Sequence, residues 1–104
     1  ATPIYFGDAS AQFKLVIDRH YAFMREDFSS RLKPGKKTVM ILSQGQPEEA
    51  MFADVFKRYE SFFKFLGFAK AESVRLCGGR DPGAAAGRPE LLAKVDKLAE
   101  MAKA

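Results

Sequence analysis

The stretch TVMILS (residues 38–43) is the feature that most restricts the fold, because its apolar residues run continuously and do not alternate with polar ones. The run is short, and β-branched residues flank its methionine. This pattern is typical of a strand that is buried on both faces, and such strands occur in parallel sheets that helices cover on both sides. The run therefore predicts an α/β fold with a parallel sheet.

Helical periodicity surrounds this strand. Apolar residues spaced three and four apart predict helices over about residues 8–24 and 47–66 and a third from Pro89 onward. The segment SVRLC (73–77) predicts a second strand, and TPIYF (2–6) resembles the end of another strand whose far side has no partner in this chain. Strands that alternate with long helices form βαβ units with right-handed crossovers, so we expect one layered domain.

Composition excludes several classes of function. The 104 residues carry a net charge of only +4, and their charges are scattered, so we expect no nucleic-acid binding. No apolar run is long enough to span a bilayer and no signal peptide is recognisable, so we expect no membrane association and a cytoplasmic location. Cys77 is the single cysteine, which excludes an internal disulfide and a metal centre held by several cysteines of this chain. We expect Cys77 to be a small buried residue and predict no metal site.

Three stretches together resemble the C-terminal half of the flavodoxin-like NADPH-dependent FMN reductases, in particular the branch that includes iron–sulfur flavoproteins. They are TPIYFGDASAQFKLVIDR, SQGQPEE, and GFAKAESVRLCGGRDPG followed by RPELL, and the resemblance covers essentially all 104 residues. It implies a truncated flavodoxin-like, three-layer parallel sheet that forms a single partial domain over residues 1–104. The chain would run from the end of the third strand of that fold through its third helix, fourth strand, fourth helix and fifth strand to its fifth helix, with the N-terminal half absent.

The resemblance also implies a cofactor site. In sheets of this kind ligands bind beyond the carboxyl ends of the strands, where the loops PIYFG and SQG would converge. An aromatic side chain of the first loop would stack on a flavin ring, and backbone N–H groups of both loops would meet its polar edge. The predicted cofactor-binding residues are Pro3, Ile4, Tyr5, Phe6, Gly7, Ser43, Gln44 and Gly45. A simpler interpretation stays open for both loops, in which the aromatics fill a core and SQGQP is an ordinary turn from a strand into a helix.

Two functions from different classes follow. The first is an FMN-binding, NAD(P)H-dependent oxidoreductase that transfers hydride through FMN and has no catalytic side chain of its own. The segment that would grip the FMN phosphate is absent from these residues, so we expect this chain alone to bind FMN weakly and to be inactive without the missing N-terminal half. The second is a non-enzymatic α/β assembly module, a homo-oligomer that pairs through an unpaired strand edge and binds no flavin.

Overall fold

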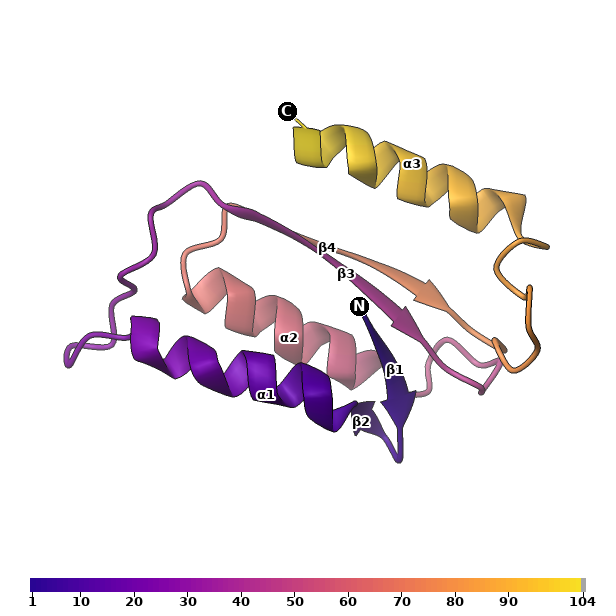
Figure 1. Cartoon of the computed structure of the whole chain (residues 1–104), viewed down its shortest axis with the longest axis horizontal. Helices are drawn as coiled ribbons and strands as arrows, with labels where there is room; N and C mark the ends of the chain where they lie inside the picture. The colour runs from indigo at the N-terminus through magenta and orange to yellow at the C-terminus, as the bar shows by residue number, and fades with distance from the viewer. Residues whose placement is uncertain (104) are drawn as a thin grey trace.

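The computed structural model describes residues 1–103 and has the layered α/β architecture that the sequence predicts (Figure 1). The sheet has the strand order β2-β1-β3-β4, in which β1, β3 and β4 are parallel. Helices α1 and α2 lie against one face of the sheet, and α3 lies against the other. In chain order the elements are β1 (Thr2–Tyr5), β2 (Asp8–Ala9), α1 (Ala11–Arg19), the 3-10 helix η1 (His20–Phe23), β3 (Lys37–Ser43), α2 (Ala53–Phe65), β4 (Lys70–Leu76) and α3 (Pro89–Lys103).

Strand β3 lies in the interior of the sheet and has parallel neighbours on both sides. Its Met40 and Leu42 belong to the buried core, together with apolar side chains of α2. Val39 and Ile41 point to the opposite face, where they line a small apolar cavity with residues of α3. Apolar residues on both faces explain the continuous run in the sequence.

The two faces are covered unequally. The buried core lies on the face of α1 and α2 and consists of Ile4, Ile17, Met40, Leu42, Val55, Phe56, Tyr59 and Phe63. Helix α3 has no buried residue, and Ile41 beneath it remains 44% exposed. Most of the hydrophobic stabilisation therefore comes from the side that carries α1 and α2.

Both of the first two helices begin later than the sequence predicts. Helix α1 begins at Ala11, because Ser10 caps it by accepting a 3.3 Å hydrogen bond from the Phe13 N–H. It ends at Arg19 and continues only as the short 3-10 helix η1. Helix α2 begins at Ala53 and not near residue 47, and residues 49–52 before it form a turn.

The first strand also differs from the prediction, because its far side has a partner within the chain. Residues Asp8 and Ala9 turn back and pair antiparallel with Tyr5 and Ile4. The expected all-parallel sheet is therefore a mixed sheet with one short hairpin. Phe6 and Gly7 form the two-residue turn, and both have a positive φ, 49° and 85°. This conformation suits a tight hairpin because its twist matches that of the paired strands.

We predict that Leu42→Ala lowers the free energy of unfolding by about 2–5 kcal/mol, because it leaves a cavity at a core position. Leu42 is only 1% exposed and lies in the interior strand. Leu15→Ala is the matched control, since Leu15 is 62% exposed on α1, and we expect a change within about 0.5 kcal/mol. Urea unfolding followed by circular dichroism measures both, and equal losses in the two variants would contradict this assignment of the core.

Candidate functional site

The carboxyl ends of the three parallel strands lie together at one edge of the molecule (Figure 1). Pro3 of β1 is in register with Ser43 of β3, and Ser43 is in register with Leu76 of β4. The loops that follow these strands, residues 6–7, 44–46 and 77–80, therefore start at the same level. We call these three loops the carboxyl-end rim.

Hydrogen bonds join two loops of the rim directly. The Gln44 N–H donates to the Leu76 carbonyl at 2.8 Å, and the Gln44 carbonyl accepts from the Gly79 N–H at 3.0 Å. The Gly78 N–H donates to the Gln46 carbonyl at 2.9 Å. The loops after β3 and β4 consequently form one bonded unit.

The first loop contributes exposed aromatic side chains. Tyr5 is largely exposed and Phe6 is fully exposed at the tip of the hairpin, whereas Pro3 is half-buried. Ile4 belongs to the core, so its side chain cannot meet a ligand at the rim. The interpretation in which the aromatics of this loop fill a core is therefore wrong for Tyr5 and Phe6.

Backbone donors remain free among the described residues of the second loop, at Gly45 and at Gln46. The Gly45 N–H donates no hydrogen bond among the described residues, whereas the Gln44 N–H is used inside the sheet. Ser43 is half-buried at the end of β3. Of the donors expected around Gln44 and Gly45, the structure leaves the one on Gly45 for a ligand.

The Gln44 side chain is directed inward. It is 2% exposed, and its Nε2 donates to the carbonyls of Gln46 and Glu48, both at 3.1 Å. Its Oε1 is buried without a partner among the described residues. The Gln44 side chain thus holds the turn that precedes α2.

Arg80 is a rim residue that the sequence prediction misses. A Cβ atom placed on Gly45 would lie 3.2 Å from Nε of Arg80, so the guanidinium packs over the backbone of that glycine. Arg80 is exposed and makes no hydrogen bond or ion pair within the described residues. The only signal in the sequence is an arginine directly after the glycine pair of CGGRD, and its contact with Gly45 joins positions 35 residues apart.

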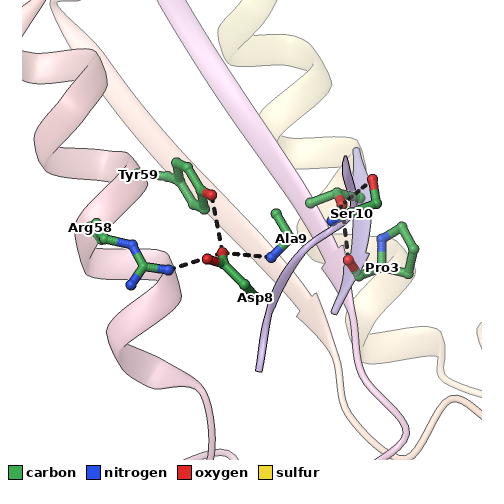
Figure 2. A network of polar contacts seen from close by, with 7 residues as sticks. Pro3, Asp8, Ala9, Ser10, Arg58 and Tyr59 are labelled. Carbon is green, nitrogen blue, oxygen red and sulfur yellow. Dashed lines mark hydrogen bonds and ion pairs between the residues drawn. The ribbon is translucent and has the colours of Figure 1, made fainter. Parts of the chain in front are cut away.

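Asp8 joins the hairpin to helix α2 (Figure 2). One carboxylate oxygen, Oδ1, accepts hydrogen bonds from the Ala9 N–H at 2.7 Å, from Arg58 Nη2 at 2.9 Å and from the Tyr59 hydroxyl at 3.0 Å. Partial burial raises the pKa of Asp8, but these bonds outweigh that effect and hold the pKa below its ordinary value of 3.8. Burial and the neighbouring carboxylate raise the pKa of Tyr59, so its hydroxyl stays protonated and donates.

A groove lies away from the predicted residues. It has a volume of about 800 Å³ and lies along the outer edge of β4, between α2 and the start of α3, and none of the eight predicted residues lines it. Cys77 lies in this groove and is half-buried, so the expectation of a buried cysteine is only partly met. Four cationic side chains and three carboxylates share the groove, and this mixed charge favours no particular class of ligand.

Two further features are absent from the part of the chain that the structure describes. Residues 1–103 contain no group of three or more His, Cys, Asp or Glu side chains placed to hold a metal ion. None of their helices combines the length and the hydropathy needed to cross a bilayer.

Comparison with known proteins agrees with this architecture. A family model described as "Flavodoxin-like fold" matches residues 1–99, which include every strand of the sheet and most of α3. No curated protein and no solved structure matches the chain. The match confirms the predicted fold class, and its description names a fold without an activity or a cofactor.

The lowered pKa of Asp8 leads to a prediction about acid stability. A carboxyl whose pKa is lower in the folded state adds stability above its ordinary pKa and loses it as the pH falls through the folded value. We therefore expect Asp8→Asn to reduce the free energy of unfolding by a constant amount above about pH 5, and this difference to shrink below about pH 4.

Urea unfolding at a series of pH values between neutrality and pH 2.5 tests this expectation. Asp96→Asn is the control, because Asp96 is exposed on α3 and makes no hydrogen bond or ion pair within the described residues. A difference between the wild type and Asp8→Asn that grows as the pH falls would show that the sign is wrong.

Proposed function

The chain belongs to the flavodoxin-like fold family, and from this premise we propose that it is a flavin-binding redox domain that uses FMN with NAD(P)H as the reductant. The family is compatible with a flavin-binding oxidoreductase, and the finer assignment to NADPH-dependent FMN reductases is part of the proposal. The ligand would bind beyond the carboxyl ends of the strands, which is the general location of ligands in open α/β sheets.

The observation that carries the proposal is the pairing of an exposed aromatic ring with a free backbone donor on one rim. Phe6 is fully exposed on the loop after β1, and the Gly45 N–H is unbonded on the loop after β3. The register of Pro3 with Ser43 brings these two loops to the same level. A planar heteroaromatic ring with a polar edge needs both kinds of contact.

The residues of this rim suit the ring of a flavin in a further respect. Arg80 lies over Gly45 and brings a positive charge to the side where the polar edge of the ring would lie. A charge in that position tunes the electronics of a flavin. When bound, FMN would supply the redox chemistry by accepting hydride from NAD(P)H and passing electrons to an acceptor. The protein would orient the ring, which requires no acid–base pair of side chains.

We propose that the rim residues bind the ring of FMN and do not bind its phosphate. The resemblance places the Ser/Thr-rich phosphate loop outside this stretch of sequence, so affinity would rest on stacking and on few polar contacts. We accordingly propose weak binding of FMN by this chain and full activity only together with the other half of the domain. A cytoplasmic location belongs to the same proposal, since a single cysteine is typical of a protein in a reducing compartment.

A second candidate is the assembly module that pairs with another copy of itself. It is favoured by β4, which is the last strand of the sheet and has no strand partner on its outer side among the described residues. Unpaired edges readily accept another strand. A second copy would bury this edge without any cofactor.

We predict that Phe6→Ala weakens FMN binding by about two- to twelvefold, because aromatic stacking contributes about 0.5–1.5 kcal/mol. Quenching of FMN fluorescence during titration with protein measures the dissociation constant. Phe28→Ala is the matched control, since Phe28 is also exposed with a positive φ but lies in the loop before β3, at the opposite end of that strand from the rim. We expect no change in that variant.

Riboflavin separates recognition of the ring from recognition of the phosphate. We expect FMN and riboflavin to bind with dissociation constants within about threefold of each other, because charge contacts to the phosphate are not assigned to these residues. A protein that quenches neither flavin and elutes as a tight dimer in light-scattering chromatography would contradict the redox proposal and support the assembly module.

A further inference from the structure

The turn at Phe6 and Gly7 needs support from outside the hairpin. Phe6 has a φ of 49°, a left-handed conformation that is unfavourable for a residue with a side chain. Strand β2 has only two residues, and so short a hairpin is not stable by itself. The turn nevertheless presents the aromatic side chain on which the proposed stacking depends.

Two contacts hold this turn, one with α2 and one with the turn that precedes α2. The first is the Asp8 carboxylate, which follows the turn directly and binds both Arg58 and Tyr59 of α2 (Figure 2). The second is packing at Gly7, where an added Cβ would lie 3.7 Å from the ring of Phe52. The first contact is directional and the second is not, so Asp8 is the residue that can fix the orientation of the turn.

Tyr59 is a rigid partner for Asp8. Its side chain is 4% exposed, and its ring packs edge-to-face on Phe13 with the centroids 5.0 Å apart. The guanidinium of Arg58 lies 5.5 Å from the centre of the same ring. Because the buried ring fixes the Tyr59 hydroxyl, the hydrogen bond from this hydroxyl restrains the Asp8 carboxylate.

We propose that Asp8 is a positioning residue, which through Arg58 and Tyr59 locks the turn to α2 and presents the Phe6 ring as a fixed platform on the carboxyl-end rim. The identity of the ring that stacks there rests on the proposed function, whereas the locking itself does not.

The lock is separable from the stability of the whole domain. Asp8 and Arg58 are both about half exposed, at 51% and 52% of their side chains, and exposed ion pairs contribute little to global stability. The base of the hairpin is held independently, since the Ser10 N–H donates to the Thr2 hydroxyl at 2.9 Å in a buried position. Loss of Asp8 should therefore loosen the turn while the core stays folded.

The chain contains no tryptophan, so Phe6→Trp introduces a single fluorescent reporter at the tip of the turn. In this background we compare Asp8→Asn and Tyr59→Phe with Asp18→Asn, a control that removes another exposed carboxylate, one that pairs with Lys14 on α1. Time-resolved anisotropy of the introduced indole measures the amplitude of its local motion. We expect at least a doubling of that amplitude in Asp8→Asn and Tyr59→Phe, and none in the control.

Hydrogen exchange of the native chain gives the same answer without the reporter. We expect protection of the Ala9 amide to fall at least tenfold in Asp8→Asn while protection in β3 and α2 is retained. Tyr59→Phe keeps the buried ring and removes only the hydroxyl, so it tests the lock even if Asp8→Asn folds poorly. Unchanged motion of the indole and unchanged exchange in a folded Asp8→Asn variant would overturn the proposal.

Titration with FMN separates this inference from the proposed function. If the lock serves stacking, Asp8→Asn should weaken FMN binding about three- to tenfold and Asp18→Asn should not. A mobile turn with unaltered FMN affinity would overturn the positioning role. If the wild type binds no flavin, the proposed function fails, and the anisotropy and exchange results still decide whether Asp8 locks the turn.

Discussion

The parallel pairing of β3 with its two neighbours is the constraint on which the rest of the structure depends. Leu42 and Met40 are buried on one face of β3, and Ile41 packs on the other. A shift of one residue along this strand would exchange the two faces, so the burial pattern fixes the register. That register places Pro3, Ser43 and Leu76 at one level, and the rim that we propose as a flavin site exists because of it.

The rim combines rigid and exposed parts. Its second and third loops are bonded to each other through Gln44, Gly78 and Gly79, so they behave as a continuation of the sheet. Its first loop is a strained two-residue turn with an aromatic tip, and its orientation depends on a carboxylate that reaches α2. Backbone strain of this kind persists only where neighbouring structure enforces it, and it is common at binding sites.

The two faces of the sheet are covered unequally, and the poorly covered face is compatible with both candidate functions. Parallel sheets in doubly wound folds are covered on both faces, but here α3 buries none of its residues and leaves Ile41 partly exposed. The outer edge of β4 also has no strand partner among the described residues. Both features suit association with further α/β structure, whether that structure is another segment of a flavodoxin-like domain or a second copy.

The sequence by itself determined the layered α/β class, the three parallel strands and the three helices, because continuous apolar runs and helical periodicity are local properties of the chain. It also predicted that the loops after β1 and β3 start at one edge of the sheet, and the register of Pro3 with Ser43 agrees with this. Only the tertiary structure decided that Asp8 and Ala9 form a strand and that Gln44 turns inward. The tertiary structure also decided the packing of Arg80 over Gly45 and the hydrogen bond from Tyr59 to Asp8. Each contact joins residues that are far apart in the sequence, so it depends on how α2 and the loop after β4 pack on the sheet.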